Sequence, residues 1–314
     1  MTKKQRFSIL IMACVFTTMS TIAQQKVIYG EDNRKESQEY FDKRFTEASA
    51  SVAGMVWSKN LLPSKDSEKE YSFNQLPVRL YYNLCKEEAF SEQVSLPTCT
   101  AFLVGPDLLL TAGHCVNNEF QCKQNKWVFN YVKGTKKIQK NNTYSCKKLI
   151  DRKLISNSSN LKDYALIQLD RAVEEVEPLP IRESGKVERS TPLVVIGHPI
   201  GLPLKIADGA KVRGFVLSNL LNPFQAFQSR KNYFITNTDT YTGNSGSPVF
   251  NERTGVVEGI LIQGKKDFSL TEDDCLSSIN YRNKRKNYEE KVFRVLQVEN
   301  LQEEIDKSYQ RTNR

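Results

Sequence analysis

Residues 99–116 read CTAFLVGPDLLLTAGHCV, two apolar runs rich in Leu and Val with Gly105, Pro106 and Asp107 between them. Short apolar runs bounded by Gly and Pro are typical of β-strands. The second run leads directly to His114, which stands beside Cys115. This stretch therefore predicts two strands followed by a residue that can carry a proton at neutral pH.

The same pattern continues along the chain. From Leu76 onward, short runs of Val, Ile, Leu and aromatic residues alternate with Gly, Pro and Asn, as in KWVFNYV, DYALIQLD, TPLVVIGHP, VVEGILIQG and KVFRVLQV. Many such runs are typical of an all-β barrel or sandwich. Helical spacing occurs only near the end, in QVENLQEEIDKSY, where Val298, Leu301 and Ile305 share one face. We predict a β body with a single C-terminal helix.

The composition is that of a folded protein. The chain has 314 residues, of which 39% are hydrophobic and 26% charged, so it is long enough to bury a sizeable core and is not biased toward disorder. Residues 31–74 are polar and charged apart from one apolar island, ASVAGMVW, and we predict a packed arm there. We find no internal repeat and no phosphate-binding loop.

Residues 1–25, MTKKQRFSILIMACVFTTMSTIAQQ, have a basic start, an apolar run and small residues before Gln24. This pattern predicts a signal peptide over residues 1–23 and a secreted or periplasmic protein with no membrane contact after its removal. An uncleaved anchor is the alternative, but the run is short for a bilayer span and contains Thr and Ser. A lipoprotein start at Cys14 is a weaker alternative, because the residues after it remain apolar.

Loss of the leader would lower the formal net charge from +9 to +6, because Lys3, Lys4 and Arg6 leave with it. The remaining basic residues are scattered rather than gathered with aromatic residues, so we expect no nucleic-acid partner. Six cysteines remain after Cys14 is removed. An even number in an exported chain predicts disulfides, and the sequence alone leaves fifteen connectivities. No CxxC pair occurs, which disfavours zinc.

Ser245 lies in YTGNSGSPVF, residues 241–250, with glycines close on both sides. By itself it reads as a turn residue. A serine becomes a nucleophile only with a base to take its proton and a third group to orient that base. The chain has two histidines, His114 and His198, and a suitable acid is Asp163, just before the apolar strand in LKDYALIQLD. A lone histidine near a core or an aspartate at a turn is usually structural, so only the combination is informative.

Taken together, CTAFLVGPDLLLTAGHCV, DYALIQLD and TGNSGSPVFN, in the order His, Asp, Ser, resemble the signature segments of the trypsin-like (chymotrypsin-fold) serine peptidases. VIYGEDNR near the start, and Asn244, are similar to the bacterial secreted branch that includes the glutamyl endopeptidases. The resemblance covers about two thirds of the chain, from roughly Leu96 onward. It implies two six-stranded antiparallel β-barrels with the site in the cleft between them, an N-terminal arm and the C-terminal helix.

On this resemblance the chain divides into a signal peptide over residues 1–23, an arm with a short propeptide over 24–75, a first barrel over 76–185 and a second barrel with the helix over 186–314. The propeptide would be QQK, cut before Val27. Activation by a freed N-terminus at an aspartate before the nucleophile is not expected, because that position is Asn244.

The resemblance implies a serine endopeptidase that works through an acyl-enzyme. His114 would be the base, Asp163 would orient it, and Ser245 would attack the peptide bond. The backbone N–H groups of Gly243 and Ser245 would form the oxyanion hole. We expect protein or peptide substrates, a monomer, and no metal or organic cofactor. The alternative is a non-catalytic binding protein on the same fold.

The resemblance also bears on specificity and disulfides. The histidine that glutamyl endopeptidases carry after the nucleophile is replaced here by Leu261 and Ile262, so Glu preference is not expected. Asp239, six residues before Ser245, stands where trypsin binds Lys or Arg, although it could also brace the turn. We expect Gln263 and Gly264 to contact substrate as well. Cys99–Cys115 matches a family disulfide, and the simplest pairing of the rest is Cys122–Cys146 and Cys85–Cys275. His198 is expected to be structural.

Overall fold

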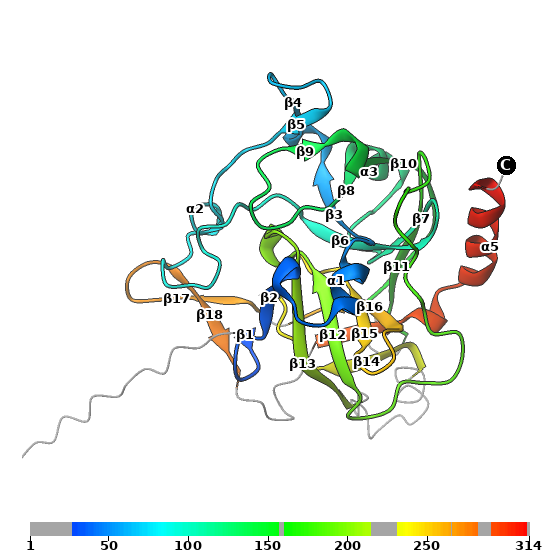
Figure 1. Ribbon diagram of the computed structural model, residues 1–314. Coiled ribbons are helices and arrows are strands. Elements are labelled where there is room, and N and C mark those ends of the chain that lie inside the picture. Colours follow the sequence, from blue (N-terminus) through cyan, green and yellow to red (C-terminus); the bar gives the residue numbers. More distant parts are fainter. Residues whose placement is uncertain (1–26, 157–159, 215–230, 265, 282–289, 313–314) are drawn as a thin grey trace, which may run out of the picture.

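The computed structural model describes residues 27–156, 160–214, 231–264, 266–281 and 290–312. The predicted signal peptide and the predicted QQK propeptide lie outside the described residues. Two β-barrels make up the body (Figure 1). No helix in the described part of the chain has the length and apolar character needed to cross a membrane.

The first barrel is closed, and its six strands pair in the order β10-β11-β7-β6-β3-β8. Their bounds are Val52–Trp57 (β3), Cys99–Gly105 (β6), Leu108–Thr111 (β7), Asn125–Phe129 (β8), Thr143–Ile155 (β10) and Lys162–Leu169 (β11). The two runs of the opening stretch are therefore the antiparallel neighbours β6 and β7. They are buried on both faces, which explains why they read as continuous apolar runs.

The predicted arm needs a correction. Its apolar island contains β3, which pairs with β6 and β8 and is an integral strand of the first barrel. The barrel therefore begins at Val52, before the predicted start at residue 76. The sequence obscured this because a polar insertion of about forty residues, 58–98, separates β3 from β6.

The second barrel is also closed by six strands, since the series β12-β15-β16-β19-β14-β13 returns to its start through a β12–β13 pairing. Their bounds are Pro192–Gly197 (β12), Lys205–Gly214 (β13), Tyr233–Thr236 (β14), Pro248–Asn251 (β15), Val257–Gln263 (β16) and Glu290–Arg294 (β19). A seventh strand, Arg34–Glu36 (β2), adds to β13 from outside. The predicted fold of two six-stranded barrels is confirmed.

Two small sheets extend the barrels. One joins Val27–Ile28 (β1), Leu276–Asn280 (β18) and Phe268–Leu270 (β17), and the other joins Leu62–Pro63 (β4), Glu70–Ser72 (β5) and Ile138–Gln139 (β9). The first brings the start of the described chain to the β17–β18 hairpin, which lies beside the turn that carries Ser245 in the second barrel.

The predicted C-terminal helix is present as Leu301–Thr312 (α5), with Leu301 and Ile305 buried. Figure 1 shows it standing on one side of the first barrel, where it contacts β6 and β7. Its Arg311 donates two hydrogen bonds to Asp107, at 2.7 and 2.9 Å, and Ser308 donates a third at 2.5 Å. Asp107, in the turn between β6 and β7, thus holds the helix in place.

Three further helices among the described residues show that the prediction of a single helix was wrong. They are Lys43–Ser49 (α1), Val78–Tyr82 (α2) and Glu119–Gln124 (α3). Each is too short to show a helical period in the sequence. Two of them begin at a side-chain cap instead, since Asp42 and Asn118 accept hydrogen bonds from the first turns of α1 and α3.

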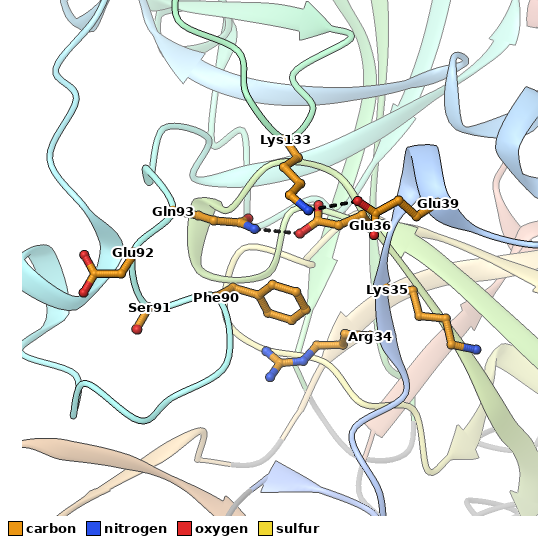
Figure 2. A pocket seen from close by; sticks show the side chains of 9 residues that line it. All are labelled: Arg34, Lys35, Glu36, Glu39, Phe90, Ser91, Glu92, Gln93 and Lys133. Atoms are coloured by element: carbon orange, nitrogen blue, oxygen red, sulfur yellow. Dashed lines mark hydrogen bonds and ion pairs between the residues drawn. The ribbon is translucent and has the colours of Figure 1, made fainter.

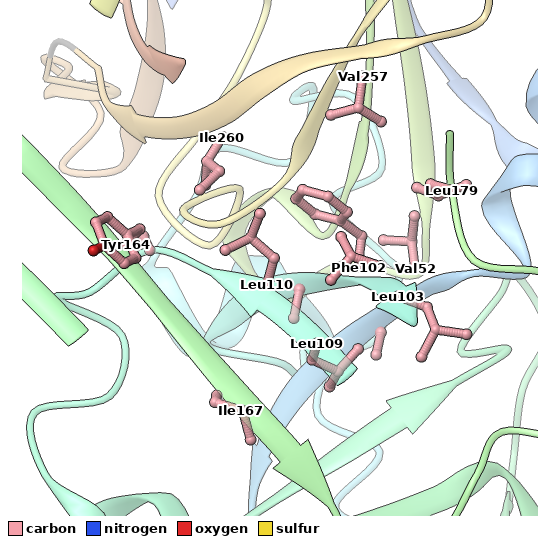
Figure 3. Packing of buried hydrophobic residues seen from close by; sticks show 14 of the residues in the cluster. Val52, Phe102, Leu103, Leu109, Leu110, Tyr164, Ile167, Leu179, Val257 and Ile260 are labelled. Atoms are coloured by element: carbon pink, nitrogen blue, oxygen red, sulfur yellow. The ribbon is translucent and has the colours of Figure 1, made fainter. Parts of the chain in front are cut away.

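The two barrels share one apolar core. Figure 3 shows Phe102 and Leu110 of the first barrel near Val257 and Ile260 of the second, and all four are fully buried. Burial of each such side chain contributes about 1.5–3 kcal/mol. Because this core continues across the seam, loops at the edges of both barrels are held in fixed positions relative to one another.

Candidate active site

His114 follows β7 directly, on a loop that presses against the neighbouring strands. A Cβ on Gly113 would lie 2.4 Å from the Lys153 carbonyl oxygen and 2.7 Å from that of Tyr164, so only glycine permits this approach. The loop thereby places His114 next to the N-terminal end of β11, where Asp163 lies. The His114 side chain is partly exposed, at 36%.

Asp163 lies at the start of β11, and it is buried. Its Oδ1 accepts a hydrogen bond from the backbone N–H of His114 at 3.0 Å, and its Oδ2 lies 2.7 Å from His114 Nδ1. One carboxylate thus fixes both the backbone and the ring of the histidine. With Nδ1 as the donor in this pair, the other ring nitrogen, Nε2, is available as a base.

Ser245 lies in the turn before β15 and is half-buried. Its carbonyl oxygen accepts a hydrogen bond from Thr100 N–H at 2.8 Å and lies 3.6 Å from Cys115 Sγ. A ring nitrogen of His114 lies within 4.8 Å of the same sulfur. The Cys115 sulfur therefore lies beside both the His114 ring and the Ser245 backbone. His114 and Ser245 are 131 positions apart in the sequence.

The turn around Ser245 leaves two backbone donors open. The N–H groups of Asn244, Gly246 and Ser247 are all bonded within the turn or to β16. Across the described residues, by contrast, nothing accepts a hydrogen bond from the N–H of Gly243 or of Ser245. A pair of free N–H groups flanking a serine is what a developing oxyanion requires.

Neighbouring carbonyls fix the direction of these two donors. The Thr242 carbonyl accepts from Ile200 N–H at 2.5 Å, and the Asn244 carbonyl accepts from Ser247 N–H at 2.9 Å. Because C=O and N–H of a trans peptide point in opposite directions, the N–H of each following residue points away from these contacts. Gly243 has φ +99°, and a Cβ there would lie 2.5 Å from the His198 carbonyl oxygen. The turn requires glycine at this position.

All three predicted disulfides are present: Cys99–Cys115, Cys122–Cys146 and Cys85–Cys275. The first joins β6 to the His114 loop. The third ties the insertion before β6 to the β17–β18 hairpin across 190 residues. The two pairings that were chosen only for simplicity are thereby confirmed along with the one that the resemblance implied.

A comparison with family models matches residues 99–260 to the trypsin-like peptidase domain. That range covers about half of the chain and contains His114, Asp163 and Ser245. The chain belongs to the trypsin-like peptidase family. No curated protein matches the sequence.

A comparison with solved structures matches, among others, a protease, VesB of Vibrio cholerae, and a Glu endopeptidase in complex with MPD. VesB is 14% identical over 84% of this chain and 64% of its own, with a TM-score of 0.49. The Glu endopeptidase is 15% identical over 92% of this chain and all of its own, with a TM-score of 0.48. The chain thus spans just under two thirds of the VesB chain.

A narrow pocket of about 110 Å³ opens beside Ser245 in this trypsin-like peptidase. Its size suits one side chain rather than a large ligand. Gln263 and Gly264, which the sequence predicts as substrate contacts, line this pocket, but Asp239 does not. The complete lining is Thr240, Tyr241, Thr242, Ser245, Leu261, Gln263, Gly264 and Asp267.

Asp239 precedes Thr240 of the pocket lining and holds the N-terminal segment. Its Oδ1 accepts from Tyr29 N–H at 2.8 Å, and its Oδ2 accepts from the backbone and side chain of Asn33 at 3.1 and 3.3 Å. The same segment places the Arg34 guanidinium 4.1 Å from the centre of the Tyr241 ring, in the pocket wall. The geometry is that of a brace, the second of the two interpretations that the sequence left open.

Asp267 is the carboxylate that reaches the pocket. Its Oδ2 accepts from Thr242 N–H at 2.8 Å and from Thr242 Oγ1 at 2.5 Å. In the described part of the chain nothing donates to its Oδ1. Burial raises the pKa of Asp267, and the two Thr242 hydrogen bonds oppose this shift. Sequence reasoning missed this residue, because it lies in the loop between β16 and β17, and local sequence patterns do not show which way such a loop folds.

The charge on Asp239 gives a stability prediction. Burial raises the pKa of Asp239 to about 6, against the opposing effect of its N–H donors. Between about pH 4 and pH 6 the unfolded chain loses this proton while the folded chain keeps it, so the contribution of the group to stability falls as pH rises. A shift of about two units is worth roughly 3 kcal/mol. The difference in unfolding free energy between wild type and Asp239→Asn should fall by about this amount from pH 4 to pH 7.

Urea unfolding followed by tryptophan fluorescence at pH 4, 5, 6 and 7 measures that difference. Asn retains one acceptor oxygen, so the N-terminal segment keeps a partner in the variant. A difference that is constant with pH, or that rises, would contradict the assigned titration.

His198 lies directly before the short 3-10 helix Pro199–Gly201, between β12 and β13, and its position is structural. It is buried, its Nδ1 lies 2.9 Å from the Leu202 carbonyl oxygen, and burial lowers its pKa to about 4. The ring is therefore neutral at physiological pH, as expected of a residue that fills space.

A larger cavity of about 670 Å³ lies away from Ser245, between β2 and the insertion before β6. Figure 2 shows two pairs among its polar side chains: Gln93 donates to Glu36, and Lys133 donates to Glu39. Buried Lys205 completes the pairing of Glu36 at 2.9 Å. Because these charges are satisfied within the wall, we assign no chemistry to this cavity.

Proposed function

We propose that this protein is a serine endopeptidase in which Ser245, His114 and Asp163 act as the catalytic triad. The proposal rests on one observation above the others. Within the described residues nothing accepts a hydrogen bond from the N–H of Gly243 or of Ser245, and the Ser245 backbone and the Asp163-bound His114 both lie beside the Cys115 sulfur. Nucleophile, base, orienting group and oxyanion donors are the complete set that acyl transfer to serine needs.

Each group then has a defined role. Ser245 Oγ attacks the carbonyl carbon of the substrate while His114 Nε2 takes the hydroxyl proton, and the carbonyl oxygen becomes an oxyanion held by the two N–H groups. The C–N bond breaks as His114 returns the proton to the leaving amine. Water then attacks the acyl-enzyme with the same help from His114, which releases the acid and restores Ser245. Asp163 holds the Nδ1–H tautomer and stabilises the charged ring.

We also propose that the protein is exported and acts outside the cytoplasm as a monomer on protein or peptide substrates. Three disulfides within the described residues support this, because such bonds form and persist in oxidising compartments. Digestion of a mixed peptide library by the purified protein tests the activity and reads out the residues around the cut. No cleavage of any peptide under native conditions would count against the proposal.

The same library tests substrate preference. We propose that the pocket beside Ser245 prefers Lys or Arg, because the Asp267 carboxylate lines it and has an open oxygen for a cation. Asp267→Asn should lower kcat/KM for Lys and Arg substrates about 10- to 100-fold relative to an uncharged isostere, since a buried charge would lose its partner.

Two matched variants sharpen this test. Asp273→Asn changes an exposed carboxylate on the same hairpin and should leave the preference intact. Asp239→Asn should change stability more than preference, because Asp239 bonds to Tyr29 and Asn33 instead of lining the pocket. If Asp239→Asn abolished the preference and Asp267→Asn did not, the cation would have to be assigned to Asp239.

A further inference from the structure

A second cavity shares no lining residue with the Asp267 pocket. It measures about 430 Å³ and is lined by aromatic and aliphatic side chains that include Trp57, Leu62 and Tyr81. These three are 43%, 59% and 63% exposed. Single exposed apolar residues are ordinary, but several around one cavity indicate a binding surface.

One chain of hydrogen bonds joins this cavity to the turn. Ser95 and Leu96 line the cavity, and they donate to the carbonyls of Ile200 and Gly201, both at 2.8 Å. Ile200 N–H in turn donates to the carbonyl of Thr242, the residue before Gly243. Ile200 and Gly201 therefore connect the cavity wall to the turn that carries Gly243 and Ser245.

The polypeptide itself makes a second connection. Thr98 lines the cavity, Cys99 after it is bonded to Cys115 beside His114, and Thr100 N–H donates to the Ser245 carbonyl at 2.8 Å. Thr98 precedes Thr100 by two residues, a span of about 6.6 Å at the rise of a strand, so a short extended peptide would reach from Ser245 to the cavity wall at Thr98.

The cavity and the Asp267 pocket belong to different halves of the molecule. The pocket is lined from the second barrel and its β17–β18 hairpin, whereas the cavity is lined by β3 and by the insertion that follows it, in the first barrel. A peptide whose cleaved bond lies at Ser245, with one side chain in the Asp267 pocket, therefore extends its other half toward this cavity.

We propose that this cavity binds an aromatic or large aliphatic side chain one or two residues after the cleaved bond, and we call it the leaving-group cavity. Its lining includes Lys59 and no carboxylate among the residues that the structure describes, which disfavours a cationic occupant. Lys59 Nζ lies 3.4 Å from the centre of the Trp57 ring, so the cation is already associated with the wall. The inference rests on the proposed peptidase function.

Competition between water and an added amine for the acyl-enzyme tests this cavity separately from the part of the enzyme that binds the acyl group. The enzyme is supplied with the best substrate from a panel of N-acyl amino acid methyl esters, and dipeptide amides compete with water for the acyl group. Ala-Phe-amide and Ala-Leu-amide are compared with Ala-Gly-amide, and Phe-Ala-amide with Gly-Ala-amide. We expect the apolar member of at least one set to capture the acyl group about tenfold better than its glycine counterpart.

The variants assign that advantage to the cavity. Tyr81→Ala, and independently Leu62→Ala, should remove most of it while hydrolysis of the methyl ester stays within about twofold, because methanol leaves the cavity unused. Both residues are exposed, so the substitutions spare the core. Phe120→Ala is the control, since Phe120 is 70% exposed on α3 and does not line the cavity.

The possible outcomes distinguish failure of this inference from failure of the proposed peptidase function. Ester hydrolysis with no preference among the amides, or a preference that survives both cavity variants, would overturn the leaving-group cavity and leave the peptidase intact. Absence of ester hydrolysis across the panel would overturn the proposed function, and the cavity assignment with it.

Discussion

Replacing Ser245 with Ala is expected to lower kcat for peptide hydrolysis by about 10⁶-fold, the order found when a triad nucleophile is removed. The fold should survive, because the contacts of Ser245 in the turn are made by its backbone carbonyl, which Ala retains. Steady-state hydrolysis of a peptide substrate identified from the library measures the loss, and circular dichroism verifies the fold.

Two further variants show whether the triad acts as a unit. His114→Ala should cost nearly as much as Ser245→Ala, and the double variant should be little worse than either, because neither group works alone. Ser247→Ala is the matched control, since this buried serine lies two residues further along the same turn and, within the described residues, its hydroxyl bonds only to Asn244 Oδ1, at 3.5 Å. Activity in Ser245→Ala near that of Ser247→Ala would mean that the nucleophile lies elsewhere.

Replacing Asp163 with Asn is expected to lower kcat by about 10⁴-fold. The Asn oxygen can still accept from His114 N–H, but its amide group would face Nδ1 as a donor. Nδ1 would then have to accept, which moves the ring proton to Nε2, the atom that must take the proton from Ser245. The geometry would survive with the wrong tautomer.

Asp151→Asn is a suitable comparison for this variant. Asp151 lies on the adjacent strand β10 and accepts from Tyr164 Oη at 2.8 Å without touching His114. We expect its kcat to stay within a few-fold of wild type. Equal losses in the two variants would indicate a general effect on the first barrel instead of a tautomer effect at His114.

The sequence was informative where chemistry constrains residue type and spacing together. A base, an acid and a nucleophile had to be found among two histidines and few suitable partners, and the structure puts His114 and Asp163 in direct contact. The short apolar runs predicted the barrel strands for the same reason, because burial on both faces leaves little choice of side chain.

The sequence was less informative where long-range geometry decides. Asp239 and Asp267 are both acidic residues near Ser245 in the sequence, and only the path of the N-terminal segment shows that the first binds Tyr29 and Asn33 while the second faces the pocket. Strand β3 was misplaced because the 58–98 insertion separated it from its partner. Both errors concern loop lengths, which local patterns do not encode.

The insertion between β3 and β6 is bonded to the β17–β18 hairpin. They are tied by Cys85–Cys275, and by a hydrogen bond from Cys85 N–H to the Leu276 carbonyl at 3.0 Å. One carries part of the wall of the leaving-group cavity, and the other follows Asp267. Substrate preference on both sides of the cleaved bond would thus depend on two segments added to the barrels and held to one another.

Reaction of the purified protein with a fluorophosphonate, followed by peptide mass spectrometry, tests the central claim most directly. The account predicts one adduct, on Ser245, formed in proportion to the loss of peptidase activity, absent in Ser245→Ala and greatly slowed in Asp163→Asn. An adduct on a different residue, or peptide hydrolysis that persists after Ser245 is fully modified, would contradict it.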